Sequence, residues 1–392
     1  MLKIKISDVM IILLTFALVP IYSLGWGWVN FSRNIVLTIC AIYMVIHIKD
    51  LRWDNMAPML GYLITIYLSS LLNKEHLDVE SLLRHVLLLL EIAAIPEIIT
   101  RKETVNHVAK IMSYLLGIYW IISIAVSFYI GAVPYGSGDV YFIGSKFNVA
   151  YLCVLIIFLY GISKVENFRA PKCMLYIIWL VSIFACIRIN AYTGVTMMAI
   201  SLILFIYENY FMKTGQRWRM IGSPFILQGM VILSGAIVIV IAGIFSTSII
   251  SHIITSLNKT GTINSRLMIY SYLGKIIQSK PLLGYGFNTD IVKVTYAENA
   301  QNGLMKIIVE NGFVGAFFFL WVVWSRIKYA NSGKNKVCNW YIIWIIAYII
   351  SAVIEITYSY HFILILELFY LQCMEIKEGV HKNVEGSNCY NY

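Results

Sequence analysis

Long apolar runs, separated by short charged connections, dominate this sequence of 392 residues. Hydrophobic residues make up 60% of the chain and charged residues only 13%. A water-soluble fold cannot hide that much apolar surface, whereas a lipid bilayer accepts it on the outside of a helical bundle. The sequence therefore predicts an all-α polytopic integral membrane protein.

About twelve of these runs are suited to membrane-spanning helices. We expect them at 7–24, 35–48, 56–72, 82–100, 111–130, 147–163, 173–190, 193–211, 224–246, 312–325, 337–355 and 361–375. They form one transmembrane domain over 1–375, and the polar tail over 376–392 is expected to be cytoplasmic and loosely ordered. The first run lacks a small-residue cleavage site, so we interpret it as a retained span.

The distribution of basic residues predicts the orientation. Nineteen Lys and Arg residues fall on one side of the expected spans, and five fall in the short connections of the other side. Cytoplasmic connections of membrane proteins collect positive charge. Both termini are therefore expected in the cytoplasm, and the net charge of +10 does not require a nucleic-acid partner.

The interval 247–312 is the longest polar stretch, and it separates the ninth span from the tenth. Long loops are exempt from the charge rule, and the alternation of spans places this one outside the cytoplasm. It is expected to carry the catalytic residues.

The first segment of this loop predicts an amphipathic helix that begins at Arg266. Asn264 or Ser265 can cap it, and apolar residues then recur at helical spacing (Leu267, Tyr270, Leu273 and Ile277) until Pro281. Such a helix lies on the membrane surface or on the bundle. At its N-terminus, Arg266 either binds a phosphate group or extends toward lipid headgroups.

Two further stretches complete the loop. Gly284-Tyr285-Gly286 provides a backbone that is free to turn sharply and approach a ligand closely. Gln301 and Asn302 precede a short helix with Glu310 near its end, and Asn311-Gly312 is a helix-ending signal. Asn302 either binds a sugar hydroxyl or caps that helix.

These residues resemble the signature of the O-antigen ligase and Wzy-type polysaccharide polymerase superfamily. The resemblance rests on Ser265-Arg266, Pro281-Leu282-Leu283-Gly284-Tyr285-Gly286, Asn302, Glu310, Gly312 and Gly315. It implies a GT-C-like membrane fold with a large helical outer loop. It also implies a donor and an acceptor linked to undecaprenyl diphosphate, glycan transfer without a metal or other cofactor, and a diphosphate contact at Arg266.

The sequence departs from the superfamily pattern in two places. Ligases of the superfamily commonly have a His where this chain has Gln301, and an amide cannot accept a proton as a base. This difference favours a polymerase over a ligase. A Ser-Arg pair is also replaced by Tyr192-Thr193-Gly194, and Arg188 is the candidate substitute.

The chemistry requires cations for the leaving diphosphate and a base for the attacking hydroxyl. Arg84, Lys146 and Arg188 lie on the expected outer side and join Arg266 as candidate cations. For the base we rank Glu298 first, with Asp290, Glu310, His252 and His361 as alternatives. The alternative interpretation of each of these carboxylates is a solvated loop residue without a catalytic role.

Ionisable residues inside the spans need a separate interpretation. Glu355 and His361, together with Tyr358 and Tyr360, are expected near the outer face, where they can line an acceptor-sugar site. Glu91 and Glu367 are expected to make structural pairs within the bundle.

Three functions remain open at this point. The first is polymerisation of lipid-linked repeat units into O-antigen, capsule or exopolysaccharide at the bacterial cytoplasmic membrane. The second is an O-antigen-type ligase, and the third is a transporter or flippase of the lipid-linked unit. The expected partners are the bilayer, a chain-length regulator and a separate flippase, and no nucleic acid.

Overall fold

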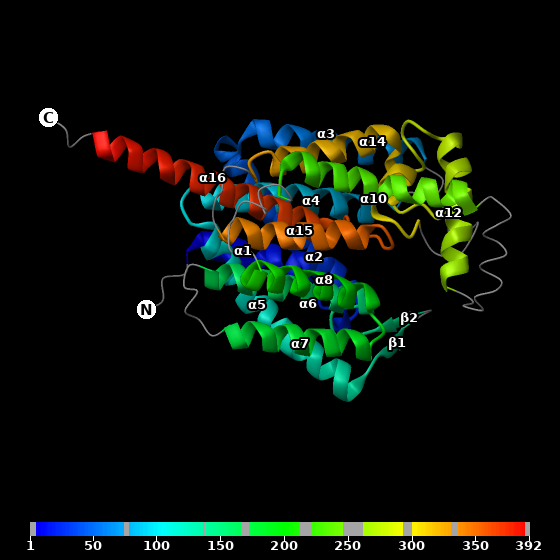
Figure 1. Cartoon of the computed structure of the whole chain (residues 1–392), viewed down its shortest axis with the longest axis horizontal. Helices are drawn as coiled ribbons and strands as arrows, with labels where there is room; N and C mark the ends of the chain where they lie inside the picture. The colour runs from blue at the N-terminus through cyan, green and yellow to red at the C-terminus, as the bar shows by residue number, and fades with distance from the viewer. Residues whose placement is uncertain are drawn as a thin grey trace.

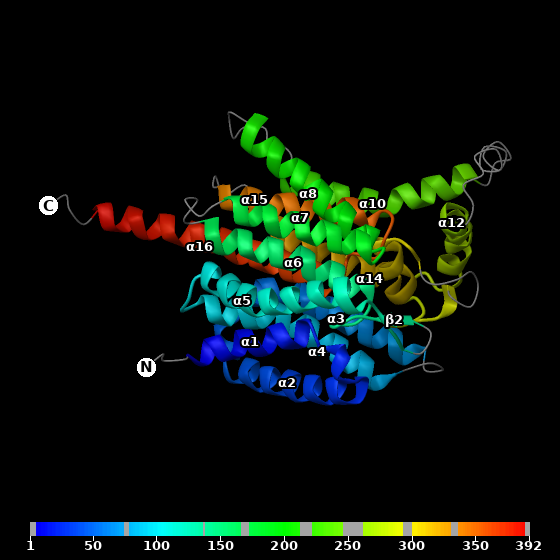
Figure 2. The ribbon, with the colours of Figure 1, turned by 90° about the horizontal axis from the view of Figure 1, so that it is seen from below.

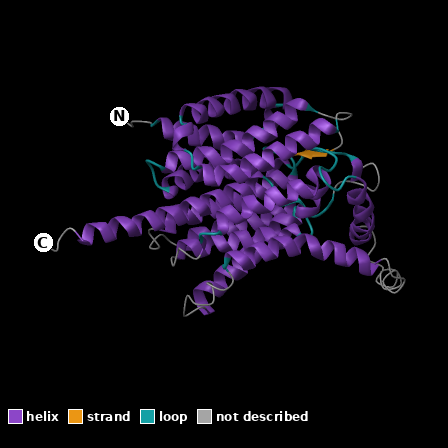
Figure 3. Cartoon of the chain, turned by 90° about the horizontal axis from the view of Figure 1, so that it is seen from above, coloured by secondary structure: helices purple, strands orange, loops and turns teal. Residues whose placement is uncertain are grey.

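The computed structural model describes residues 5–73, 78–135, 138–165, 172–211, 222–245, 262–292, 300–330 and 336–388. Most helices run side by side along the long axis and form a bundle with both termini at one end (Figures 1 and 2). Helix α12 lies across the opposite end, which we call the α12 end. The described chain is almost entirely helical, apart from connections and one small hairpin (Figure 3).

The helices of the first half are α1 (Ile6–Leu18), α2 (Trp26–Ile46), α3 (Trp53–Leu72), α4 (Val79–Thr100), α5 (Val105–Ala125) and α6 (Lys146–Val165). A π-helical turn (Val126–Ile130) continues α5. Strands β1 (Val133–Tyr135) and β2 (Gly138–Val140) then form an antiparallel hairpin at the α12 end.

The helices of the second half are α7 (Lys172–Arg188), α8 (Tyr192–Phe211), α10 (Pro224–Phe245), α12 (Thr262–Ser279), α14 (Gly303–Ile327), α15 (Lys336–Ala352) and α16 (Tyr360–Asn388). Each expected span overlaps a helix, although several bounds differ. Five stretches are long and apolar enough to cross a bilayer, namely Gly27–Ile46, Trp53–Leu72, Val105–Ile130, Lys146–Lys164 and Gly303–Ile327, and further apolar helices are shorter. These helices support a membrane protein.

Helix α12 confirms the expected amphipathic pattern but begins earlier than expected. Ile269, Tyr270 and Leu273 are buried, whereas Lys275 and Gln278 are exposed. The helix already includes Thr262, so Asn264 and Ser265 lie inside it and do not cap it. Once a helix has started, each added residue gains a hydrogen bond, which favours this longer form.

The C-terminal segment also differs from the expectation. Helix α16 continues through Asn388, where a loosely ordered tail was expected after the last span. In two views it projects from the bundle at the end where the termini lie (Figures 1 and 2). Helix propagation from a long buried segment accounts for the extension.

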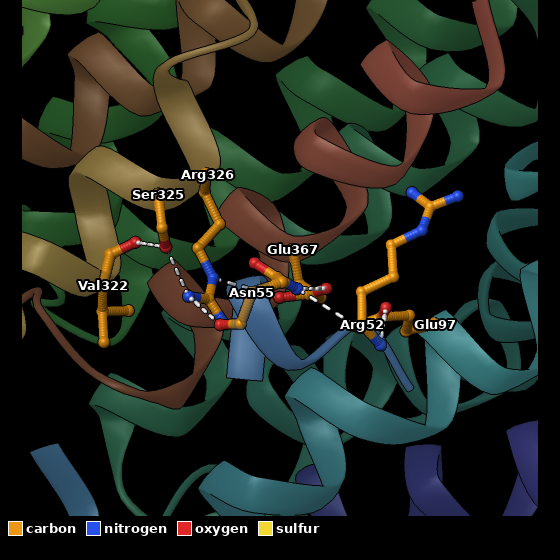
Figure 4. Close-up of polar contacts among 7 residues, drawn as sticks. All are labelled: Arg52, Asn55, Glu97, Val322, Ser325, Arg326 and Glu367. Atoms are coloured by element: carbon orange, nitrogen blue, oxygen red, sulfur yellow. Dashed lines mark hydrogen bonds and ion pairs between the residues drawn. The ribbon is translucent and has the colours of Figure 1, made fainter. Parts of the chain in front are cut away.

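Buried polar and charged side chains join four helices (Figure 4). Arg326 of α14 and Glu367 of α16 are fully buried, with Arg326 Nε and Glu367 Oε2 3.2 Å apart. Asn55 of α3 donates to Glu367 and to Glu97 of α4, over 3.2 and 3.1 Å. The expected pairing of Glu367 within the bundle is therefore confirmed, with Arg326 as its partner.

Glu91 behaves differently from Glu367. Its side chain is fully buried in α4, and neither carboxylate oxygen has a hydrogen-bond partner among the residues that the structure describes. The expectation of a structural pair at Glu91 is therefore not met there.

Candidate functional site

Helix α14 is interrupted at Gly312, which has φ 65° and ψ −170°. The interruption leaves backbone groups of both helix halves without intrahelical partners, and the turn 280–287 satisfies them. Four hydrogen bonds join the two segments: Tyr285 N to Val309 O (2.9 Å), Gly286 N to Glu310 O (2.8 Å), Phe313 N to Pro281 O (2.8 Å) and Val314 N to Leu282 O (3.2 Å). The two motif segments found in the sequence are therefore interlocked.

The glycines of the turn permit this close backbone packing. Gly284 has φ 65°, and a β-carbon on it would lie 2.5 Å from the Val309 carbonyl oxygen. Gly286 has φ 92°, and a β-carbon on it would lie 3.1 Å from the Ser70 α-carbon. The sequence predicts that Gly284-Tyr285-Gly286 approaches a ligand closely. In the structure, the two glycines closely approach the backbone of other segments of this chain. Tyr285 is half-buried, and its hydroxyl donates to Ile276 O over 3.1 Å.

The end of α3 holds the interlocked segments in place. The Ser69 hydroxyl contacts the carbonyl oxygens of Leu283 and Glu310, the latter at 2.6 Å. Asn73 Nδ2 donates to Gly284 O over 3.2 Å, and Ser70 Oγ accepts from Phe287 N over 2.9 Å. Sequence reasoning missed this role of α3, because serines near the end of an apolar run carry no signal of a distant partner.

Glu310 and Asn302 are both engaged by the fold. Glu310 Oε1 accepts from Asn288 N over 3.2 Å and lies 3.7 Å from Lys306 Nζ. Asn302 is fully buried, and its Oδ1 accepts from Met305 N over 2.9 Å as the N-cap of α14. Its Nδ2 donates to Ser234 O and Val353 O. Of the two alternatives for Asn302, the structure shows the helix cap.

Gln301 lies beside this cap in an uncommon backbone conformation. Its φ is 47°, and its carbonyl oxygen accepts from the Tyr270 hydroxyl of α12 over 2.9 Å. This bond connects α12 to the start of α14.

A second polar cluster forms at the start of α16. His361 is 4% exposed, and its ring stacks on Tyr151 of α6 with centroids 4.8 Å apart. Tyr360 also packs on His361, with centroids 4.3 Å apart. Glu355 Oε2 accepts from Thr193 Oγ1 over 3.2 Å. Thr193 lies in the first turn of α8.

Arg33 of α2 interacts with residues of both clusters. Its Nε donates to Ala17 O over 3.0 Å, which orients the half-buried guanidinium. Arg33 interacts electrostatically with His85, Tyr360 and His361, and with the buried carboxyl group of Glu91. Lys306 also acts on His85, whose ring stacks on Phe287 of the turn at 4.5 Å. Within the described ranges, Arg33 makes no ion pair with a carboxylate.

The sequence did not single out Arg33, Lys306 or His85. The second span was expected at 35–48, which left Arg33 in a connection, whereas α2 begins at Trp26. The sequence did contain one signal for Arg33, which is a cation inside an apolar run. Such a charge normally faces a partner or a polar cavity.

The other expected site residues lie on separate elements. Arg84 pairs with Glu80 at 2.5 Å, Lys146 Nζ lies 5.6 Å from the Phe147 ring centroid, and Arg188 is exposed at the last residue of α7. Arg266 belongs to α12, but its side chain is outside what the structure describes. Glu298 and His252 also lie outside the described residues.

A cavity of about 380 Å³ lies at the end of the bundle that carries the termini. Some of its charged residues form ion pairs: Arg52 contacts Glu378, and Glu103 lies 2.5 Å from Lys5. It contains none of the residues that carry the resemblance, so we do not include it in the candidate site.

Comparison with known proteins gives one partial relationship. The chain is 29% identical, over 107 aligned positions, to a Rickettsia felis protein named "Putative polysaccharide ligase". The alignment covers 21% of this chain and 26% of that relative. No protein-family model matches the chain.

Proposed function

We propose that this protein transfers a glycan from an undecaprenyl-diphosphate-linked donor to an acceptor hydroxyl at the α12 end of the bundle. The favoured form of this reaction is polymerisation of lipid-linked repeat units into a surface polysaccharide. Its place is the outer face of a bacterial cytoplasmic membrane, with both termini in the cytoplasm.

One observation carries the proposal. Arg33 is a half-buried guanidinium that interacts electrostatically with residues of both polar clusters. In the described part of the chain it forms no ion pair, and its interaction with the Glu91 carboxyl is longer than one. A cation inside an apolar span normally faces a partner with negative charge or a polar cavity. A diphosphate supplies that charge, and the planar guanidinium matches two of its oxygens.

The neighbouring residues suit the rest of the reaction. The acceptor oxygen attacks the anomeric carbon, the bond from that carbon to the diphosphate oxygen breaks, and the hydroxyl proton is released. Arg33, Lys306 and Arg266 are the proposed cations for the developing charge on the leaving group. Glu298, and the Glu355 and His361 cluster, are the candidates for binding or deprotonating the acceptor hydroxyl.

Arg84, Lys146 and Arg188 remain proposed contacts for the remaining phosphate or sugar groups. Gln301, Glu310 and the Gly284 turn are proposed to form the support on which the donor lies. The interlocked turn and helix break provide a rigid support of this kind, because their backbone groups are mutually satisfied.

A ligase is the second candidate, and the name of the R. felis relative favours it. Gln301 favours the polymerase, because a neutral amide cannot act as the base that a His supplies. The two functions share the donor and differ in the acceptor. A ligase moves finished glycan to a different molecule, whereas a polymerase joins two copies of the donor.

The test uses the purified full chain in lipid nanodiscs with an undecaprenyl-diphosphate oligosaccharide. A polymerase converts it into a ladder of longer lipid-linked glycans, with release of undecaprenyl diphosphate. A ligase leaves chain length unchanged until a separate acceptor, such as lipid A core, is added. If neither product forms while vesicles containing the protein move the lipid-linked unit across the bilayer, the glycosyl-transfer proposal is wrong and the transporter is right.

A further inference from the structure

Helix α15 buries a stripe of hydrogen-bonding side chains that the candidate site does not use. Tyr341, Trp344, Tyr348 and Ser351 are each no more than 1% exposed. Their spacing of three, four and three residues places them on one face of the helix. We call these four residues the α15 stripe.

The polar atoms of the α15 stripe have no hydrogen-bond partner among the residues that the structure describes. They are the Tyr341 and Tyr348 hydroxyls, Trp344 Nε1 and Ser351 Oγ. Native proteins contain few such atoms, because a buried group without a partner has lost its hydrogen bonds to water. Four on one helix face therefore indicate a common cause.

Neighbouring aromatic residues show that the packing itself does not prevent hydrogen bonding. Trp340 Nε1 donates to Phe158 O over 2.9 Å, and Trp179 Nε1 donates to Met198 O over 3.1 Å. Both indoles belong to the same aromatic cluster as Trp344, since each lies 5.9 Å from it between ring centroids. Among these three indoles, that of Trp344 is the one without a hydrogen-bond partner in the described part of the chain.

The α15 stripe faces the inside of the bundle. Tyr341 packs on Phe158 of α6 and on Phe369 of α16, with centroids 5.3 and 5.7 Å apart. Tyr348 packs on Phe362 of α16 at 5.7 Å. Lipid therefore does not reach the polar atoms of the α15 stripe. Hydrocarbon chains also have no groups that could form hydrogen bonds with them.

We propose that a file of buried water molecules binds along the α15 stripe. A water molecule both donates and accepts, so it can satisfy the hydroxyls and the indole of the stripe, and buried waters make about three hydrogen bonds each. From Tyr341 to Ser351 the helix rises about 15 Å, roughly half of the hydrocarbon thickness of a bilayer.

One end of the water file reaches the candidate site. Ser351 lies in the last turn of α15, directly before the connection that carries Glu355. Thr357 Oγ1 donates to Tyr348 O over 2.9 Å, and the Tyr151 hydroxyl donates to Ile356 O over 2.9 Å. The water file therefore extends the polar cluster around His361 toward the middle of the bundle.

Hydroxyl-radical footprinting of the full chain in nanodiscs tests the proposal. X-ray pulses create radicals from bound water, and these label side chains next to it even where bulk solvent is excluded. The expected result is labelling of Tyr341, Trp344 and Tyr348 at several times the rate of Trp340 and Trp179. Equal rates in the two groups overturn the proposal.

Tyr-to-Phe variants give an independent reading. Tyr348→Phe removes a water contact, so labelling of Trp344 should fall and the melting temperature should not rise. Tyr358→Phe is the matched control, because its hydroxyl is bonded to Ser234 Oγ at 2.9 Å and lies outside the α15 stripe; it should leave Trp344 labelling unchanged. A higher melting temperature for Tyr348→Phe means that its hydroxyl has no partner, and the water file is then wrong.

Discussion

Gly312 of α14 and Leu282 of the glycine turn lie with their backbones in direct contact. A β-carbon on Gly312 would collide with the Leu282 carbonyl, and Val314 N donates to that same carbonyl oxygen over 3.2 Å. The absence of a side chain at Gly312 is therefore what allows the turn to enter the helix break. This contact joins two segments that are separate in the sequence and together form the support of the candidate site.

Gly312→Ala should destabilise the protein more than an ordinary helix substitution. The φ of 65° with ψ of −170° is accessible essentially only to glycine, and such strain costs on the order of 1–3 kcal/mol before the collision with Leu282 is added. The melting temperature of the purified protein in detergent measures this. Gly274→Ala is the control, because a β-carbon there meets nothing within 4 Å. Equal melting temperatures for the two variants would contradict the interlocked turn.

Arg33→Gln should abolish glycan transfer without unfolding the protein. Loss of one preorganised donor to a developing oxyanion typically lowers the rate about 100-fold or more. Arg33→Lys keeps the charge but loses the planar fork, so we expect an intermediate activity. Transfer is measured with the lipid-linked oligosaccharide in nanodiscs. Arg101→Gln is the matched control, since Arg101 lines the cavity at the end of the bundle that carries the termini, outside the candidate site, and it should retain most of the activity.

Arg266→Ala and Arg266→Lys should both lose product while the protein is expressed at normal levels. The reason is the proposed contact between this guanidinium and the donor diphosphate, which a lysine cannot form in the same bidentate way. Polymer length on gels, together with protein abundance in membranes, gives the result. Wild-type chain output from either variant would remove Arg266 from the diphosphate site.

Arg326→Met should destabilise the protein by about 3–5 kcal/mol, because it leaves the buried Glu367 carboxylate without its cation. Adding Glu367→Met should recover most of that loss, since two apolar side chains of similar size replace the ion pair. Thermal unfolding of the two single variants and of the double variant measures the coupling. Additive losses in the double variant would show that Arg326 and Glu367 do not act as a pair.

Several features were predictable because they depend on local sequence. A helix forms at every apolar run, the amphipathic pattern after Arg266 becomes α12, and Asn311-Gly312 marks a real interruption. For Asn302 the sequence is compatible with a sugar ligand or a helix cap, and its burial and its bond to Met305 N show the cap. The helix boundaries were less accurate, because propagation carries helices past weak start and stop signals.

The residues that meet at the candidate site were not predictable in the same way. Arg33 of α2, His85 of α4 and Lys306 of α14 come from elements distant in the sequence, and hydropathy carries no information about which helices are neighbours. The same holds for Ser69 against the glycine turn and for Arg326 against Glu367.

The sequence alone determined that the chain forms a helical bundle with one amphipathic helix outside it. The reason is that the burial of apolar groups in lipid depends only on composition and on the helical spacing of the apolar residues. Only the tertiary structure decided which polar groups share an environment. It showed that the glycine turn completes the broken helix and that Arg33 interacts with residues of two clusters. Hydrogen bonds and ion pairs act over a few ångströms, so their partners are fixed by packing and not by position along the chain.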